Sequence, residues 1–228
     1  MQTETAMEHM PEHVRARLAE GWLETALAEH ASVASFARFT LHLLAAGAPP
    51  HLLEASHQAG LDEIKHARAC FKLAARYRGE AMGPGPLPMS GDVLGPTDLP
   101  SLTAAAVIEG CVGETLSALE AAEAAQIATD AEVKSVLVDI AEEEGRHAEL
   151  AWAFVTWAVQ QGGEATRSAV TRAFAECEQK HKMAICPEQD PDADWLHAHG
   201  HVTDRMRFEV RVRGWREVVQ PGRAALLG

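Results

Sequence analysis

Two stretches decide the fold of this chain, namely Asp62-Glu63-Ile64-Lys65-His66-Ala67 and Glu143-Glu144-Gly145-Arg146-His147-Ala148. A pair of glutamates five residues apart precedes each stretch, Glu24 and Glu29 in the first half and Glu109 and Glu114 in the second. Residues three apart share one face of a helix, so each Glu-x-x-His unit directs a carboxylate and an imidazole the same way. A four-helix bundle with two such halves can gather ligands around a pair of metal ions.

The length and composition suit one helical domain over residues 1–228. Of the 228 residues 47% are hydrophobic, enough for a sizeable core, and only 5% are aromatic. Alanine and leucine dominate, which favours helices over sheets and predicts an all-α fold. The formal net charge of −13 predicts that neither nucleic acid nor an anionic membrane is a partner.

The N-terminal residues and the lengths of the apolar runs predict a cytoplasmic protein. Residues 1–10 lack the basic start and the apolar segment of a signal peptide. No uninterrupted apolar run approaches the roughly 18 residues that a membrane span needs. The cysteines form no Cys-x-x-Cys pair, which argues against a zinc ribbon or a rubredoxin-type iron site. In a reducing compartment we expect these four residues to be free thiols: Cys70, Cys111, Cys177 and Cys186.

The apolar pattern predicts four core helices, over residues 18–46, 51–78, 102–128 and 129–160. Ser101 is expected to cap the third helix, and Thr129 with Glu132 fits a capping box that opens the fourth. A stretch rich in proline and glycine, 83–100, is long for a connection between packed neighbours and suits a crossover between the second and third helices. Residues 161–228 form a C-terminal extension with a helix over 164–182. The segment 203–219 fits a strand or a helix, and a helix is favoured because a strand has no partner.

The Glu-x-x-His pattern occurs twice more, and helical geometry separates those matches from the first two. Glu54 precedes Glu63 by nine residues, half a turn around the helix at about 100° per residue, so Glu54 and His57 are predicted to face solvent. Glu178 and His181 lie in the fifth predicted helix, outside the bundle core. We interpret both pairs as surface residues.

Register along the two helical hairpins favours Glu29 and Glu114 as the single-glutamate ligands. Both lie among apolar residues, where a carboxylate without a partner would be costly. Glu24 and Glu109 lie about 140° away around their helices and are predicted to miss the metal face. A role for Glu109 as a mobile extra ligand stays open. The run of His197, His199 and His201 is interpreted as a surface loop.

These motifs, in this order and spacing, resemble those of the ferritin-like di-iron carboxylate superfamily, in particular rubrerythrin-type and small ferritin-like domains. The resemblance covers residues 18–160 and implies a ferritin-like four-helix bundle that binds two iron ions. It implies that Glu63 and Glu144 bridge the irons, that Glu29 and Glu114 are terminal carboxylates, and that His66 and His147 each hold one iron. Manganese or zinc also suits a mixture of carboxylate and imidazole ligands.

The resemblance has two departures and leaves several functions open. The chain has no rubredoxin domain, and its only tyrosine, Tyr77, follows His66 by about three turns, too far for a radical beside the metals. We expect a di-iron oxidoreductase that reacts with dioxygen or peroxide and uses an external reductant. It would be an oxygenase with a small-molecule substrate, like the aldehyde-deformylating oxygenases that it resembles in length and ligand order, or a ferroxidase or peroxidase. The alternatives are iron binding or storage without an organic substrate and a metal-free helical interaction module. The C-terminal extension is expected to pack on the bundle or to form a homodimer.

Overall fold

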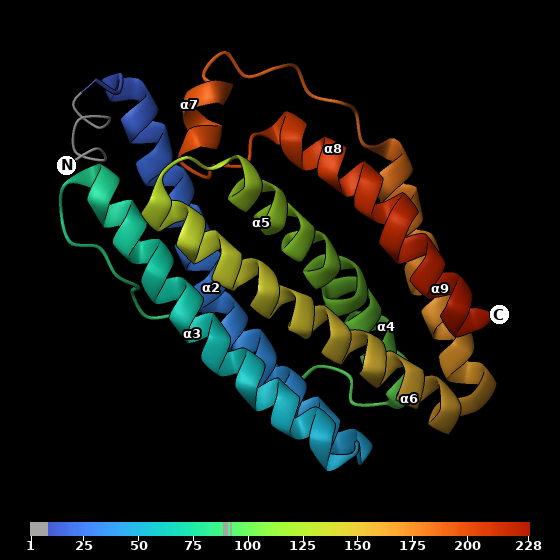
Figure 1. The fold of residues 1–228 in the computed structure, drawn as a ribbon. Coiled ribbons are helices and arrows are strands. Elements are labelled where there is room, and N and C mark those ends of the chain that lie inside the picture. The colour runs from blue at the N-terminus through green and yellow to red at the C-terminus, as the bar shows by residue number, and fades with distance from the viewer. Residues whose placement is uncertain (1–8, 89–90, 92) are drawn as a thin grey trace.

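The computed structural model describes residues 9–88, 91 and 93–228, and these contain helices and no strand. The first two helices, α2 (Glu12–Ala46) and α3 (Pro50–Arg78), form an antiparallel hairpin (Figure 1). Gly47 ends α2 in the left-handed region, with φ 68°, where glycine has no steric penalty. The predicted first hairpin is therefore confirmed, although α2 begins earlier than expected, directly after Pro11.

The third rod of the bundle is continuous but changes its helix type. It consists of α4 (Leu99–Ala106), the π-helix η1 (Val107–Glu114) and α5 (Thr115–Ile127). The prediction that Ser101 caps this rod is wrong. Asp98 caps it instead, because its carboxylate accepts a hydrogen bond from the Ser101 backbone N–H. Pro100 lies in the first turn, where a residue without an N–H is tolerated. The π-helix was not predicted.

The fourth rod, α6 (Ala131–Met183), consists of two helices that meet at a sharp bend. Gly163 has φ 58° and ψ −145°, a conformation that only glycine adopts readily, so the chain turns there. The predicted boundary at Gly162-Gly163 is confirmed. The cap is Asp130 and not Thr129, because the Asp130 carboxylate accepts the N–H groups of both Glu132 and Val133.

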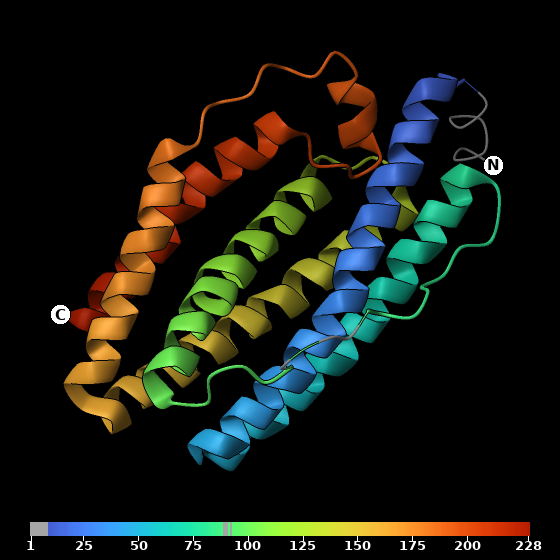
Figure 2. The same ribbon diagram turned by 180° about the vertical axis from the view of Figure 1, so that it is seen from behind.

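The extension after the bend folds back over one side of the bundle (Figure 2). It contains the second part of α6, then α7 (Ala193–Ala198), α8 (Asp204–Gly214), the π-helix η2 (Trp215–Val219) and α9 (Gln220–Leu227). The helical interpretation of 203–219 is correct and the strand alternative is wrong. Arg207 and Arg211 of α8 both pair with Glu120 of α5, which holds the extension against the bundle.

The connection between α3 and α4 runs back along the bundle, so the two hairpins are joined by one long crossover (Figures 1 and 2). Gly79 ends α3 with φ 83°, and the chain stays without helix until Leu99 in its described residues; residues 89, 90 and 92 lie outside the description. The predicted order of short hairpin, long crossover and short hairpin is therefore present.

Two apolar clusters fill the bundle, one toward each end. The first contains Phe36, Leu150 and Phe154, and the second contains Trp22 and Leu73, each with many further buried residues. On α2, α3 and α6 the predicted ligands occupy the interval between the residues of the two clusters. The polar groups therefore lie in a layer across the middle of the bundle, enclosed by apolar side chains at both ends.

The third rod has a further property. By length and composition alone, the helical stretch Leu99–Ile127 would be sufficient to cross a membrane, with a mean hydropathy of 1.3 in its most apolar window. This stretch is not an uninterrupted apolar run, because it contains Glu109, Glu114 and Glu120. In the fold this stretch packs along α6 as a rod of the bundle. The absence of a membrane partner and the cytoplasmic location stay predictions.

Candidate metal centre

The structure brings all six residues that were predicted as metal ligands into one buried layer. Every rod of the bundle contributes, and the side chains form two overlapping groups whose ligand atoms lie within 4.8 Å of one another. The first group is Glu29, Glu63, His66 and Glu144, and the second is Glu114, Glu144 and His147. The duplicated sequence pattern thus becomes a pair of adjacent sites that share Glu144.

The distances place the two Glu-x-x-His glutamates between the two imidazoles. The His66 Nδ1 atom lies 3.4 Å from a Glu144 oxygen and 3.9 Å from a Glu63 oxygen, and it is also 3.4 Å from Glu29. The His147 Nδ1 atom lies 3.3 Å from the other Glu63 oxygen and 3.4 Å from the other Glu144 oxygen. Glu63 and Glu144 therefore each offer one oxygen to His66 and the other oxygen to His147. A bridging carboxylate needs this arrangement.

The outer nitrogen of each imidazole meets a carboxylate from the opposite half of the chain. His66 Nε2 is 2.7 Å from Glu143, and His147 Nε2 is 3.4 Å from Asp62. An N–H donated to a carboxylate at Nε2 leaves Nδ1 as the free ligand atom and orients the ring. Sequence reasoning missed this role, although the signal was available because Asp62 and Glu143 directly precede Glu63 and Glu144.

The two outer carboxylates are held in place by residues on their own or the neighbouring helix. Asp62 accepts a hydrogen bond of 2.8 Å from the Gln58 amide and lies 3.8 Å from Arg146. Glu143 pairs with Lys65 at 2.8 Å. Both basic residues lie at the second position after a ligand glutamate, so each half repeats this outer arrangement as well.

The inward-facing atoms of the site fit metal ions because they lack other partners. Among the described residues, five buried side-chain atoms make no hydrogen bond, and four of them belong to this site: Glu63 Oε2, His66 Nδ1, Glu144 Oε2 and His147 Nδ1. Such groups are costly when they are buried and unpaired. A transition-metal ion, which accepts lone pairs from carboxylate and imidazole together, would fit this set of atoms.

Without metal, the electrostatics of the layer favour bound protons. Burial and the neighbouring Glu63 raise the pKa of Glu29 to about 8, and burial with Glu144 raises that of Glu114 to about 11. Burial lowers the pKa of His147, but Glu144 and Glu63 outweigh it and raise that pKa to about 9. Burial alone would raise the pKa of Glu144, but the contacts with His147 and His66 outweigh burial and lower that pKa. Metal binding must therefore displace protons from this layer.

The π-helix changes the expected relation of Glu109 to Glu114. Hydrogen bonds in a π-helix join residues five apart, so the two glutamates differ in direction less than the 140° of an α-helix. Both line the same cavity, which corrects the expectation that they face different sides. Glu109 nevertheless belongs to neither ligand group. It is exposed and pairs with Arg38, and Glu24 is exposed as well.

The two other Glu-x-x-His matches belong to neither candidate ligand group. The prediction that they are surface residues is correct for Glu54 and His57 but wrong for Glu178 and His181, which are half-buried. Glu54 and His57 are exposed on α3. Glu178 pairs with Lys182 and Arg223, and His181 stacks on Trp215 with ring centroids 5.1 Å apart. These contacts place the second pair at the packing between α6 and the C-terminal helices.

The interpretation of the histidine run as a surface loop is wrong for its central residue. His199 is buried, and its Nδ1 lies 2.9 Å from the Tyr77 hydroxyl. Its carbonyl accepts a hydrogen bond from the Trp22 indole at 3.3 Å. His201 lines a cavity beside the bundle, and His197 contacts Thr203 at 3.0 Å. The run therefore fastens the extension to the bundle, a tertiary role that spacing does not reveal.

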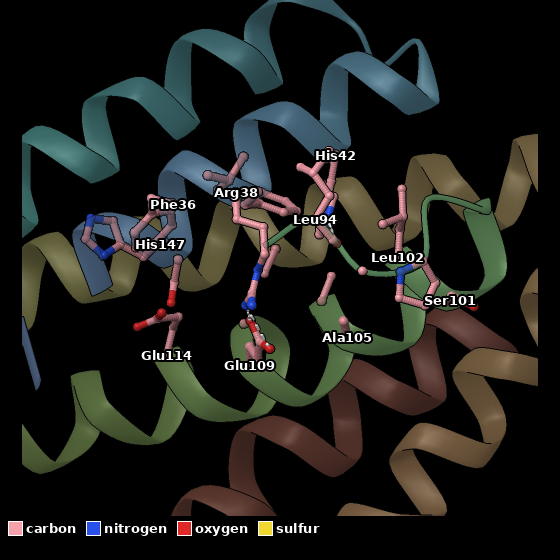
Figure 3. A pocket seen from close by; sticks show the side chains of 18 of the residues that line it. Phe36, Arg38, His42, Leu94, Ser101, Leu102, Ala105, Glu109, Glu114 and His147 are labelled. Carbon is pink, nitrogen blue, oxygen red and sulfur yellow. Dashed lines mark hydrogen bonds and ion pairs between the residues drawn. The ribbon is translucent and has the colours of Figure 1, made fainter. Parts of the chain in front are cut away.

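Two cavities reach the site from opposite ends of the gap between α2 and the third rod. We define the apolar cavity, about 360 Å³, by Phe36, Phe39, Leu102 and Leu150, and it ends at Glu114 and His147 (Figure 3). A second cavity, about 520 Å³, is called the polar cavity because it is lined by three of the candidate ligands and by both acidic and basic side chains. Its polar lining residues are Glu24, Thr25, Glu29, Ser32, Glu114, Ser117, Glu120, Glu144, His201, Arg207 and Arg211. The layer of candidate ligands therefore lies between the two cavities.

The prediction that the cysteines are free thiols agrees with the structure. All four are free, and only Cys186 is exposed. Comparisons of the chain with protein-family models, with curated proteins and with solved structures give no match. The function is therefore argued from the geometry of this site.

Proposed function

We propose that the protein is a di-iron carboxylate oxidoreductase of the ferritin-like type, which reacts with dioxygen or peroxide. The observation that carries the proposal is the duplicated layer of carboxylates and imidazoles, in which four buried inward-facing atoms make no hydrogen bond. Glu63 and Glu144 would bridge two ions, with His66 and Glu29 on one side and His147 and Glu114 on the other. A metal-free interaction module would leave those atoms unpaired in an apolar interior, which is costly.

Bound iron would supply the redox chemistry, and the chain's own residues supply ligands, orientation and a dry cavity. Glu143 and Asp62 hold the imidazoles so that both Nδ1 atoms face the layer. Phe36 packs edge-on against the His147 ring, with centroids 4.8 Å apart, and limits water on that side. The carboxylate-rich ligand set favours the ferric state, so oxidation of ferrous iron is downhill. Electrons for repeated turnover would come from an external reductant.

Iron binding or storage without an organic substrate is the second candidate, and the polar cavity favours it. Its carboxylates Glu24 and Glu29 lead from the surface to the candidate ligands and suit the passage of a hydrated cation, whereas Glu120 in the same cavity is paired with Arg207 and Arg211. A storage protein assembles into a cage of many subunits. Sizing of the native protein separates the two candidates, because an oxidoreductase of this length is expected as a monomer or a homodimer.

The proposal is tested by metal analysis and by oxidation of the loaded protein. The chain is expected to hold two ions after anaerobic ferrous loading, and exposure to oxygen is expected to give the near-ultraviolet absorption of ferric carboxylate. His66→Ala should lower the metal content, whereas His57→Ala, an exposed match to the same motif, should leave it unchanged. Fewer than one ion per chain, or iron that stays ferrous in air for hours, would contradict the proposal.

A further inference from the structure

The apolar cavity has the features of a binding site for a small organic molecule. Its volume of about 360 Å³ lies at the lower end of the roughly 300–1,000 Å³ that small-molecule sites occupy. Phe36, Phe39 and Leu102 give it apolar walls, and its polar lining residues are Ser35, Arg38, His42, Ser101, Glu109, Glu114 and His147. Its inner end consists of Glu114 and His147, so a bound molecule would lie directly beside one half of the ligand layer (Figure 3).

An ion pair spans this cavity between α2 and η1. Arg38 of α2 donates from Nη2 to both carboxylate oxygens of Glu109, at 3.0 and 3.3 Å (Figure 3). The side chains are 35% and 59% exposed, so the pair lies at the solvent side of the cavity. An exposed ion pair contributes little to stability, and a ligand can therefore replace one of its partners at small cost.

The unequal exposure of the two partners decides which charge the ligand carries. An anionic ligand group would take the place of Glu109 at Arg38, and the displaced Glu109 carboxylate would turn into water, where it already lies for the most part. A cationic group would instead displace Arg38, which is two-thirds covered and would lose its counterion beside apolar walls. The planar guanidinium also matches a carboxylate with two parallel hydrogen bonds.

We propose that the apolar cavity binds a small carboxylic acid, with the carboxylate on Arg38 and the hydrocarbon chain among Phe36, Phe39 and Leu102. This inference rests on the proposed function in one respect, since it makes the acid the organic substrate class of the metal centre. In the absence of the acid, the Glu109 carboxylate pairs with Arg38 in its place. The apolar part of the molecule is small, in keeping with the volume of the cavity.

The probes are octanoate, octanol and octylamine, which share a chain and differ in charge. Each is titrated calorimetrically at pH 7 into the full chain as purified and again after treatment with EDTA, so that a carboxylate bound to metal is distinguished from one bound to Arg38. Octanoate should bind at least tenfold more tightly than the other two in both samples. Ala105→Phe, which fills the cavity from its partly exposed wall, should abolish binding of all three.

Variants of the ion pair give the decisive comparison. Arg38→Gln should weaken octanoate at least tenfold and leave octanol unchanged, whereas Glu109→Gln should keep octanoate binding or tighten it. Arg78→Gln is the matched control, because Arg78 is an exposed arginine that pairs with Glu20 on the same bundle, far from this cavity. Circular dichroism confirms that each variant is folded.

Three results would overturn the inference: octylamine binding most tightly, equal loss of octanoate in Arg38→Gln and Arg78→Gln, or no binding of any probe. If no probe binds while two metal ions remain per chain, the acid site is wrong and the proposed function stands. If the metal content falls below one ion while octanoate still depends on Arg38, the acid site stands and the proposed function fails.

Discussion

Replacement of Glu114 by Gln should change stability in opposite directions with and without metal. In the unfolded chain a glutamate ionises above about pH 4.5, whereas burial and Glu144 raise the pKa of Glu114 to about 11 in the folded, metal-free protein. The folded state therefore retains a proton that the unfolded state loses. The free energy of unfolding falls as the pH rises through that interval, and Gln, which cannot ionise, removes this loss.

The expected size of the effect follows from the pH interval. From pH 4.5 to pH 7, at about 1.36 kcal/mol per pH unit, the gain for metal-free Glu114→Gln has a ceiling of about 3.4 kcal/mol. We expect about 1–3 kcal/mol at pH 7, less than the ceiling, because Glu29 and Glu114 titrate together and each changes the proton affinity of the other. At pH 5 the ceiling falls to about 0.7 kcal/mol. The Gln amide can still donate to Glu144, as the protonated Glu114 carboxyl does.

With metal bound, the same change removes a charged ligand and should be destabilising. A tenfold loss of metal affinity corresponds to about 1.4 kcal/mol, and we expect at least that. The assay is urea unfolding followed by circular dichroism at several pH values between 5 and 8, in EDTA and with saturating metal under anaerobic conditions. Glu109→Gln, five residues earlier on η1, is the control and should show neither effect. Destabilisation by Glu114→Gln in EDTA at every pH would refute the reasoning.

Three further predictions concern the ligand layer. His66→Ala should lower metal content to half or less while His57→Ala keeps two ions per chain by elemental analysis, and equal losses would refute the assignment of faces. Glu143→Gln should weaken metal affinity about 10–100-fold in a chelator competition, because the Glu143 carboxylate orients His66 at 2.7 Å; an unchanged affinity would mean that this contact has no role. Metal affinity should rise steeply from pH 6 to pH 9, because His147, with a pKa of about 9, and Glu29, with a pKa of about 8, must release protons before they bind metal. Calorimetry in buffers of different ionisation enthalpy measures that proton release. A metal affinity that does not change with pH would contradict the prediction.

The hairpins and the meeting of the six candidate ligands in one layer could be predicted from the sequence because both depend on helical periodicity. Glu29 was preferred to Glu24 from register and from its apolar neighbours, and the structure places Glu29 in the layer and Glu24 in solvent. The same reasoning set aside Glu54 and His57 correctly. A period of 3.6 residues determines which side chains meet when the helices are regular and their partners are antiparallel.

The features that were missed depend on departures from that period or on tertiary contacts. The π-helix that contains Glu109 and Glu114 cannot be predicted from the apolar pattern. Within it, Gly110 lies so close to Ala151 of α6 that an added Cβ would clash. The buried position of His199 depends on the Tyr77 hydroxyl, which is distant in the sequence. Asp98 and Asp130 cap their helices in place of Ser101 and Thr129, a shift within the usual uncertainty of helix ends.

The two halves of the site repeat in sequence, yet the two candidate ligand groups have different surroundings. The group that contains His147 and Glu114 borders the apolar cavity, whereas neither His66 nor Glu63 lines either cavity. Glu114 also lies at the end of a π-helix, a geometry that is less regular than that of the α-helices around it. An organic molecule in the apolar cavity would therefore lie beside His147 and Glu114. In the group that contains His66, Glu29 and Glu144 instead line the polar cavity, so the two halves of the layer face different surroundings.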